Sequence, residues 1–419
     1  MNTTTPPLNE QLDIIKRGVA EIIPEEDLAK KVERSIATNT PLIVKLGCDP
    51  SRPDLHIGHS VVLRKLRQFQ DLGHQAVLIV GDFTGMIGDP SGKSKTRPPL
   101  TLEATRQNGQ TYFEQATKIL SAHKIQMQYN SEWLGKMTFA DVIQLGARYT
   151  LARMLERDDF ERRYKAGEPI SIHELMYPLA QAMDSVAIRS DIELGGTDQK
   201  FNLLAGRDIQ MQFNQPPQIV MMTPLIEGLD GSKKMSKTEG NYIAVEDSPE
   251  DMFGKTMSVR DDLIIKYFVL LTEVEENEVQ EFEAALKDIE SHKDLADPLH
   301  PMQIKKALAR SIVTEYHSRS AAKRAEEQFE RVVQRKEIPD AIPLRCYQEK
   351  SILAYEMIAG LAGISTSEAR RLLSQGAVKI DGTKISDPGQ QISIGSEEQT
   401  IQVGKRKFFR VKVEETGRS

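Results

Sequence analysis

The sequence predicts an α/β protein. Its first domain is doubly wound around a parallel sheet, and a helical domain and a small α+β domain follow. Apolar runs at 42–48 and 76–82 enclose a stretch with helical periodicity, the strand–helix–strand pattern of a parallel sheet. From about 250 to 330 the strand signal fades and apolar residues recur at helical spacing. The last segment, 351–419, is short, basic and rich in turn residues.

Further elements can be placed along the chain in order. An amphipathic helix is predicted over 8–23, because apolar residues there recur every three or four positions. Helices are predicted within 139–156 and 173–188 by the same spacing. Short apolar runs at 190–194 and 218–225 supply further strands of the parallel sheet.

These changes in pattern divide the chain into four segments. The α/β domain is predicted over 1–245 and the helical domain over 246–330. Residues 331–350 are charged, contain two prolines and lack periodicity, which indicates a linker. Residues 351–419 form the small C-terminal domain.

Composition restricts the function classes. The 419 residues carry a net charge of −6, so the chain as a whole is not a basic nucleic-acid coat. The segment 351–419 nevertheless holds ten Lys and Arg against eight Asp and Glu, a net of +2, which leaves −8 for the rest. Two cysteines without a Cys-x-x-Cys pair exclude a disulfide scaffold and fit the cytoplasm. We expect neither a membrane span nor a signal peptide.

The first motif, His56-Ile57-Gly58-His59, opens the helix that follows the first predicted strand. Two imidazoles one turn apart lie where backbone N–H groups and the helix dipole favour an anion. Gly58 allows a ligand to approach the backbone closely. The motif therefore predicts a phosphate or nucleotide site. The alternatives are a pair of capping or surface histidines, or a metal site, although no third ligand lies nearby.

The second motif is the basic run Lys233-Lys234-Met235-Ser236-Lys237-Thr238, which glycines flank on both sides. Such a segment predicts a mobile loop, and lysine is a suitable point charge for a polyphosphate. A solvated surface loop is the alternative.

A third group of residues predicts a pocket for a polar small molecule. Tyr177, Gln181 and Asp184 stand at positions i, i+4 and i+7 and therefore share one helix face. Three polar groups are unusual in a core stripe and suit a ligand-binding wall. The glycine-rich segments 195–199 and 85–93 each follow a predicted strand and bring polar side chains to the same sheet edge.

Together, these motifs resemble those of a known family. A His-Ile-Gly-His and a Lys-Met-Ser-Lys-Thr about 175 residues apart resemble the paired signature of class I aminoacyl-tRNA synthetases. The pocket helix and the glycine-rich segments resemble those of tyrosyl-tRNA synthetases. Segments 367–373 and 375–382 are similar to the S4 RNA-binding domain that ends the bacterial enzymes. The resemblance spans nearly the whole chain and implies a Rossmann-like catalytic domain, a helical anticodon-side domain and an S4-like domain.

The resemblance implies a tyrosine–tRNA ligase reaction. ATP activates L-tyrosine to tyrosyl-adenylate with release of pyrophosphate, and the tyrosyl group then moves to the 3′ end of tRNA(Tyr). It implies ATP with Mg²⁺ as the substrate complex, with no tightly bound cofactor and no structural metal. It also implies a cytoplasmic homodimer that has no membrane partner.

The resemblance also implies roles for residues of the amino-acid pocket. Asp184 is implied to accept a hydrogen bond from the tyrosine phenol. Tyr177, Gln181 and Asp89 are implied to bind the α-ammonium group, and Gln199 to lie beside the carboxyl group and the α-phosphate. The full set implied for tyrosine is Lys45, Asp89, Tyr177, Gln181, Asp184 and Gln199.

Further sets are implied for ATP and RNA. Asp198 and the backbone of Gly196 are implied to hold the ribose of ATP. The ATP-binding set is Asp49, His56, Gly58, His59, Gly196, Asp198, Lys234, Met235 and Lys237. The set that acts on the phosphates during catalysis is His56, His59, Lys93, Arg97, Lys234, Lys237 and Thr238. The RNA-binding set is Arg370, Arg371, Lys379, Lys405, Arg406 and Lys407.

Lys45 departs from the family pattern. Many tyrosyl enzymes carry a tyrosine eleven residues before the first signature histidine, where it hydrogen-bonds the substrate phenol. Here that position is Lys45. Its ammonium could donate to the phenol oxygen or point away from it. We therefore expect Asp184 to carry most of the discrimination against phenylalanine.

Other functions compete with this interpretation. A tryptophanyl-tRNA synthetase shares the fold and the paired signature, but the S4-like tail and the Tyr-x3-Gln-x2-Asp helix argue against it. An inactive relative that only binds RNA is expected to have lost signature residues, yet His56, His59, Lys234 and Lys237 are all present. A metal-dependent hydrolase lacks a visible metal cluster in the sequence. The C-terminal domain could also be a folded cap with a few surface charges, although its basic residues cluster.

Overall fold

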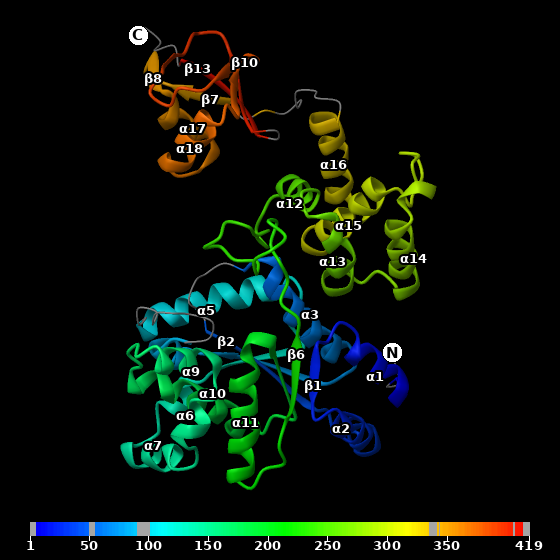
Figure 1. The fold of residues 1–419 in the computed structure, drawn as a ribbon, viewed down its shortest axis with the longest axis vertical. Helices are drawn as coiled ribbons and strands as arrows, with labels where there is room; N and C mark the ends of the chain where they lie inside the picture. Colours follow the sequence, from blue (N-terminus) through cyan, green and yellow to red (C-terminus); the bar gives the residue numbers. More distant parts are fainter. Residues whose placement is uncertain are drawn as a thin grey trace. The chain divides into compact units, whose positions relative to one another are not determined.

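The computed structural model describes residues 6–49, 55–89, 101–334, 342, 344–404 and 407–413 (Figure 1). The chain divides into two compact units. The first contains Met1–Ser248 and Lys255–Tyr316, and the second contains Pro249–Gly254 and His317–Ser419.

A six-stranded sheet forms the centre of the first unit. Its strands are β1 (Glu21–Ile23), β2 (Ile43–Cys48), β3 (Gln75–Val80), β4 (Ile125–Tyr129), β5 (Ile192–Gly196) and β6 (Ile219–Thr223). The order is β1-β6-β5-β2-β3-β4, and all neighbours are parallel except β1 and β6. The chain runs from β2 outward to β4 and then crosses to β5 on the other side of β2. The doubly wound parallel sheet predicted from the sequence is confirmed.

Helices connect and cover these strands. In the first half they are α1 (Leu8–Lys16), α2 (Glu25–Thr38), α3 (Ile57–Asp71), α4 (Thr84–Ile87), α5 (Leu102–Ala116), α6 (Ser131–Leu134), α7 (Phe139–Gly146), α8 (Leu151–Met154) and α9 (Asp158–Lys165). In the second half they are α10 (Ile172–Ile188), η1 (Thr197–Gln199), α11 (Lys200–Gln212), η2 (Asp261–Leu263), α13 (Ile264–Leu271), α14 (Glu276–Lys287), η3 (Ile289–Ser291) and α15 (Pro301–Tyr316). Helix α3 contacts β2, β3 and β5, and α11 contacts β5 and β6. Because helices cover the sheet, β3 is buried from Ala76 to Val80.

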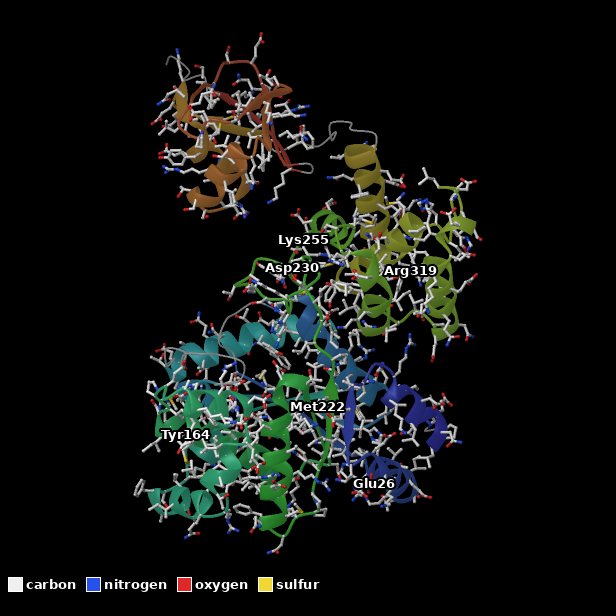
Figure 2. All side chains as sticks on the ribbon, in the orientation of Figure 1. Glu26, Tyr164, Met222, Asp230, Lys255 and Arg319 are labelled. Atoms are coloured by element: carbon white, nitrogen blue, oxygen red, sulfur yellow. The ribbon has the colours of Figure 1, made fainter. Side chains whose placement is uncertain are left out.

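The helix predicted over 8–23 is wrong in its second half. Helix α1 ends at Lys16, and β1 pairs with β6, which contains Met222 (Figure 2). Gly18 lies between them with a φ of +69°, a left-handed conformation that ends the helix. The amide of Ala20 donates to the Met222 carbonyl at 2.8 Å, so the following apolar residues extend the sheet edge.

The second unit contains a small α+β domain. The helical elements of the second unit are α12 (Pro249–Thr256), which belongs to this unit through Gly254, and α16 (Arg319–Phe329), η4 (Glu330–Gln334), α17 (Ala354–Ala362) and α18 (Thr366–Ser374). Its strands are β7 (Leu344–Tyr347), β8 (Ser351–Leu353), β9 (Val378–Ile380), β10 (Thr383–Ile385), β11 (Gln391–Ser393), β12 (Gln399–Val403) and β13 (Lys407–Val413). Five strands form a sheet in the order β10-β9-β12-β13-β7, and β8 pairs with β11. Met357, Ile358, Leu373 and Ile401 are among its buried core residues.

The segment predicted as a linker, 331–350, contains ordered structure at both ends. A π-helical turn runs through Gln334, and β7 pairs in parallel with β13. The sheet of the C-terminal domain therefore begins before residue 351. Leu344, Arg345 and Cys346 are exposed, so β7 lacks the apolar alternation that identifies a strand in a sequence.

Candidate active site

The predicted site residues follow β2 and β5, at the reversal of strand order. Asp49 comes directly after β2, and Gly196 is the last residue of β5, its neighbour in the sheet. Ligands of doubly wound folds bind outside the carboxyl ends of the strands at this point. The topology therefore brings the segment that contains His56 and His59, which follows β2, and the glycine-containing segment at the end of β5 to the same end of the sheet.

The signature histidines cap helix α3. His56 is the N-cap, and its Nδ1 accepts from the amide of Gly58 at 3.2 Å. The Nδ1 of His59 accepts from the amide of His56 at 3.2 Å, and the ring centroids are 3.8 Å apart. The capping role considered from the sequence is thus part of the arrangement. In a neutral imidazole with an accepting Nδ1, the proton lies on Nε2, so both rings retain a donor for a ligand.

Burial keeps these imidazoles neutral near pH 7. It lowers the pKa of His56 to about 2, with further contributions from His59 and the two lysines Lys237 and Lys234. It also lowers the pKa of His59 to about 4, and Lys234 adds to this effect. The pair therefore offers hydrogen bonds rather than positive charge, while the lysines supply the charge.

A cavity of about 150 Å³ joins the two signature motifs. It is lined by His56, Gly58, His59, Val62, Gly196, Asp198, Thr223, Pro224, Leu225, Ile226, Lys234 and Met235. Seven of these residues belong to the predicted ATP set. The Nζ of Lys234 lies 2.6 Å from Oδ2 of Asp198, which joins the basic loop to the end of β5. Asp49 and Lys237 of the predicted ATP set do not line this cavity.

The basic loop is anchored beside the cavity by Met235 and Asn241. Met235 is buried, and its amide donates to the Ile226 carbonyl at 2.9 Å. Asn241 accepts from the amide of Ser236 at 2.8 Å and donates to Asp230 at 3.1 Å. These contacts hold the middle of the motif and leave Lys234 half-exposed at the cavity.

Helix α10 places Asp184 in a buried polar environment. Only 3% of Asp184 is exposed, and its carboxylate accepts from Trp133 Nε1 at 2.9 Å and from Asn130 Nδ2 at 3.5 Å. Burial raises the pKa of Asp184 to about 7, against the opposing effect of Lys45. A buried carboxylate with a free acceptor site suits a ligand that brings a hydroxyl donor. Sequence patterns did not identify Trp133 or Asn130.

Tyr177 and Asp49, predicted for different substrates, contact each other. The Tyr177 hydroxyl donates to Asp49 Oδ2 at 2.9 Å, and Thr84 donates to Oδ1 at 2.7 Å. Burial, followed by the charge of Asp49, raises the pKa of Tyr177. Gly81 is required beside them, because a Cβ at this position would lie 2.0 Å from Asp49 Oδ1. The end of β2 is thereby fixed to α10.

Asp89 and Gln199 form a second polar pair at the site. Gln199 Nε2 donates to Asp89 Oδ2 at 3.0 Å, and Arg157 Nη2 donates to Oδ1 at 3.3 Å. Arg157 is only 5% exposed and also pairs with Asp159 at 2.7 Å. Sequence reasoning missed Arg157, because it stands in a charged stretch that is typical of a helix surface.

Lys45 points away from solvent and pairs with Glu193. Both side chains are fully buried, and Lys45 Nζ lies 2.9 Å from Glu193 Oε1. The two residues are register partners on β2 and β5. Lys45 also donates to Ser185 Oγ at 2.7 Å. Glu193 was missed because a single acidic residue in an apolar strand gives no functional signal without its partner.

The predicted RNA-binding residues that the structure describes lie on the surface of the C-terminal domain. Arg370 and Arg371 are exposed on α18, and Lys379 and Lys407 on β9 and β13. The guanidinium of Arg370 lies over the ring of Tyr355, 4.1 Å from its centroid. The remaining predictions Lys405 and Arg406 in this set, and Lys93 and Arg97 in the catalytic set, fall outside the described residues.

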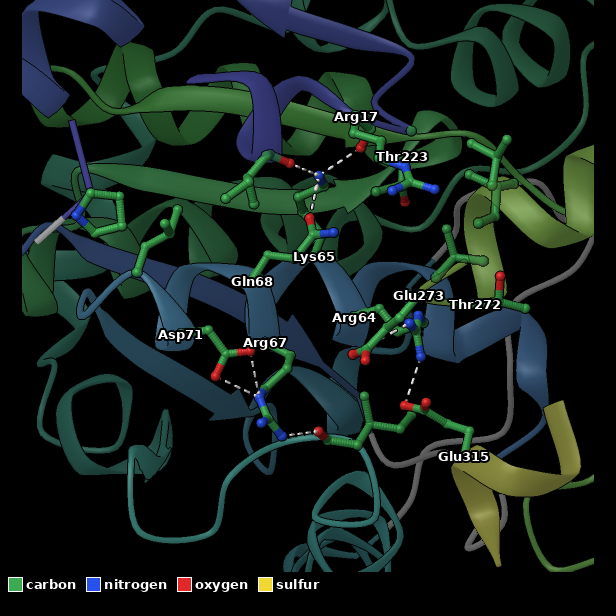
Figure 3. Close-up of a pocket in the computed structure, with 18 residues that line it drawn as sticks. Arg17, Arg64, Lys65, Arg67, Gln68, Asp71, Thr223, Thr272, Glu273 and Glu315 are labelled. Carbon is green, nitrogen blue, oxygen red and sulfur yellow. Dashed lines mark hydrogen bonds and ion pairs between the residues drawn. The ribbon is translucent and has the colours of Figure 1, made fainter. Parts of the chain in front are cut away.

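A larger cavity, about 440 Å³, lies elsewhere in the first unit (Figure 3). Lys65 is buried in its wall and donates to the carbonyls of Ile15 at 2.8 Å and Arg17 at 2.7 Å, and to Gln68 at 2.6 Å. Arg64 pairs with Glu315 at 2.6 Å. The contacts of Lys65 and Arg64 drawn in Figure 3 tie α1 and α15 to α3.

Membrane-spanning helices and clusters of metal ligands are both absent from the part of the chain that the structure describes. None of the helices there is long and apolar enough to cross a bilayer. In the same part of the chain, no three His, Cys, Asp or Glu side chains come together as metal ligands.

The fold and the site define a class I tRNA synthetase. The family of tRNA synthetases class I (W and Y) matches residues 37–334, and the S4 domain matches residues 361–397. The chain belongs to this synthetase family.

The curated relatives described next are all named tyrosine–tRNA ligase. The tyrosine–tRNA ligase of Salinibacter ruber is 53% identical over 418 residues, which is 98% of each chain. That of Moorella thermoacetica is 52% identical over 96% of this chain and 95% of its own. That of Thermotoga maritima is 53% identical over 97% of this chain and 98% of its own. The resemblance stated from the motifs is confirmed over the full length.

Solved structures share the fold at lower identity. A truncated mitochondrial tyrosyl-tRNA synthetase of Aspergillus nidulans is 20% identical with a TM-score of 0.61, over 77% of this chain and 93% of its own. The tyrosyl-tRNA synthetase of Archaeoglobus fulgidus, solved with L-tyrosine, is 21% identical with a TM-score of 0.59, over 76% and 99%.

Proposed function

We propose that the chain is a tyrosine–tRNA ligase, which forms tyrosyl-adenylate from L-tyrosine and ATP and then charges tRNA(Tyr). The observation that carries this proposal is the cavity lined by His56, His59, Gly196, Asp198 and Lys234. This cavity brings both signature motifs together beside the carboxyl ends of the strands. The pocket helix α10 is fixed to the same end of the sheet by the contact of Tyr177 with Asp49. The full-length relatives named tyrosine–tRNA ligase support the same reaction.

Activation needs no protein nucleophile. The tyrosine carboxylate oxygen attacks the α-phosphorus of ATP, an O–P bond forms, and the bond to the pyrophosphate oxygen breaks. Negative charge accumulates on the phosphate oxygens, and donors aimed at these oxygens lower the barrier. The Nε2–H groups of His56 and His59 and the ammonium of Lys234 are proposed to serve as these donors. Lys93, Arg97, Lys237 and Thr238 are proposed to act with them on pyrophosphate, and Mg²⁺ enters with ATP.

The amino-acid pocket is proposed to recognise both ends of tyrosine. Asp184 accepts from the phenol, which phenylalanine lacks, so its buried carboxylate would lose a donor with the wrong substrate. Gln181, Tyr177 and Asp89 receive the α-ammonium group. Gln199, held by Asp89 at 3.0 Å, lies beside the carboxylate that attacks ATP.

The ribose of ATP is proposed to bind at the carboxyl end of β5. Asp198 provides the acceptor, and the backbone of Gly196 lies beside it. A Cβ at Gly196 would lie 2.6 Å from Asp198 Oδ1, so glycine keeps this approach open. Met235 and Gly58 complete the wall, and Asp49 fixes the strand end nearby.

The C-terminal domain is proposed to bind tRNA through its basic residues. Arg370, Arg371 and Lys379, together with Lys405, Arg406 and Lys407, supply the positive charge that phosphates require. Binding of this kind weakens steeply as salt rises, because each neutralised phosphate releases a counterion.

A cytoplasmic homodimer is proposed as the working form. Several apolar side chains of the first unit are strongly exposed on neighbouring helices, which supports an interface between copies. They are Phe139 at 80%, Ile143 at 58%, Leu151 at 60%, Tyr164 at 67% and Ile172 at 80% exposed.

Aminoacylation of unfractionated tRNA with radiolabelled amino acids tests this function. We expect charging with tyrosine only. Charging with tryptophan would favour a tryptophanyl enzyme, and RNA binding without charging would favour an inactive regulator. Either result would overturn the proposal.

A further inference from the structure

A buried ion pair packs against the pocket helix α10, and the proposed function above gives it no task. Lys45 on β2 and Glu193 on β5 are fully buried and 2.9 Å apart. A buried ion pair of this kind is a poor stabiliser, because removing two charges from water costs about as much as their attraction returns. A pair of apolar residues would serve the core equally well. The pair therefore calls for a functional explanation.

Glu193 acts only as an acceptor, and its two oxygens are fully used. Oε1 accepts from Lys45 and from Gln181 Nε2, the latter at 3.1 Å. Oε2 accepts from Ser185 Oγ at 3.1 Å and from Gln218 Nε2. The contacts of these four donors occupy both oxygens of the carboxylate.

This arrangement determines which way the Gln181 amide faces. Its NH₂ group must turn toward Glu193, because a carboxylate can only accept. Its carbonyl oxygen is therefore the end left for a ligand. Lys45 also lies 3.5 Å from the Gln181 backbone carbonyl, which holds the same turn of α10.

We propose that Lys45 and Glu193 are positioning residues, which orient the Gln181 amide so that its carbonyl oxygen accepts from the α-ammonium group of the amino acid. This inference rests on the proposed function, because it takes tyrosine as the ligand of the Gln181 face. It also explains why a lysine can occupy position 45. Its ammonium serves Glu193 instead of the phenol.

Two double variants separate orientation from the loss of charge. Lys45→Met with Glu193→Met removes the ion pair and the acceptor for Gln181. Lys45→Met with Glu193→Gln removes the same charges but keeps a carbonyl that can accept from Gln181. We expect the first variant to have a KM for tyrosine about tenfold or more above that of the second in pyrophosphate exchange. The KM for ATP should agree within about twofold.

A ligand without the ammonium group gives the decisive readout. The inhibition constant of 3-(4-hydroxyphenyl)propionate should be the same for both double variants, because this ligand has no group for Gln181 to receive. Equal KM values for tyrosine in the two double variants would overturn the proposal. So would an inhibition constant that differs between them by the same factor as the KM for tyrosine.

Gln181→Glu provides a second test that leaves the ion pair intact and changes a partly exposed side chain. The proposal predicts weaker tyrosine binding at pH 8, because a carboxylate at this position has no donor to offer Glu193 and is repelled by it. Tighter binding, as expected if position 181 met the ammonium without Glu193, would contradict the proposal. Failure of the proposed function itself is separate: the unmodified chain would then show no tyrosine-dependent exchange.

Discussion

Asp184→Asn should stabilise the protein at pH 8 while impairing its proposed function. Burial raises the pKa of Asp184 from 3.8 to about 7, so above neutral pH the native state holds an ionised carboxylate against its preference. The stability associated with this group is fully present below pH 3.8, where both states are protonated. It is lost progressively as the pH rises toward 7.

The size of the effect follows from the pKa shift. A shift of about 3 units corresponds to about 4 kcal/mol at pH 8, at 1.36 kcal/mol per unit. About 1–2 kcal/mol is already lost at pH 5, so the change from pH 5 to pH 8 is about 2–3 kcal/mol. Asparagine keeps a carbonyl oxygen that can accept from Trp133. Its NH₂ group, however, faces other donors, and this mismatch offsets part of the gain. We therefore expect a net gain of about 1–3 kcal/mol at pH 8.

Urea unfolding of both proteins at pH 5 and pH 8 measures this difference. The free energy of unfolding of the variant, relative to the unmodified chain, should rise by about 2–3 kcal/mol from pH 5 to pH 8. Effects of pH on other groups cancel in this comparison. A difference that is the same at both values of pH would refute the reasoning, because Asp184 would then not titrate in this range.

Three further predictions follow from the geometry. Lys234→Ala should slow tyrosyl-adenylate formation about 100-fold in single-turnover kinetics, with the tyrosine KM nearly unchanged. A tyrosine KM that rises by a similar factor would contradict a role on the phosphates. The imidazole signals of His56 and His59 should not titrate in NMR spectra between pH 6 and 8, because their pKa values are about 2 and 4. Removing 344–419, which takes β7 with its sheet, should leave pyrophosphate exchange within about twofold and reduce tRNA charging more than tenfold. Equal loss of both activities would contradict separate tasks for the domains.

Features set by neighbouring residues could be predicted from the sequence. The alternation of apolar runs with helical stretches predicted the parallel sheet, and the i, i+4, i+7 spacing placed Tyr177, Gln181 and Asp184 on one helix. His56 and His59 were placed at a helix start, where their rings now cap α3. Each of these patterns depends on local geometry, which a few residues are enough to determine.

Features set by tertiary pairing could not be predicted. Lys45 and Glu193 lie far apart in the sequence, and only the register of β2 with β5 makes them partners. Trp133 reaches Asp184 from a short helix with no pattern of its own. Arg157 stands among charged residues, and only the folded structure shows that it is buried and contacts Asp89.

The same limit explains the error near the N-terminus. The apolar spacing over 8–23 fits a helix as far as Lys16. Beyond Gly18 the same side chains fit the edge of a sheet instead. The spacing alone cannot tell these alternatives apart, because the partner strand β6 is about 200 residues away in the sequence.

ATP–pyrophosphate exchange with tyrosine, phenylalanine and tryptophan tests the central claim most directly. The account predicts exchange with tyrosine and strong discrimination against the other two. It also predicts a tyrosine-to-phenylalanine ratio of kcat/KM that falls about 10- to 100-fold in Asp184→Asn, the worth of one hydrogen bond to a charged group. Exchange driven by tryptophan, or a ratio that Asp184→Asn leaves unchanged, would contradict it.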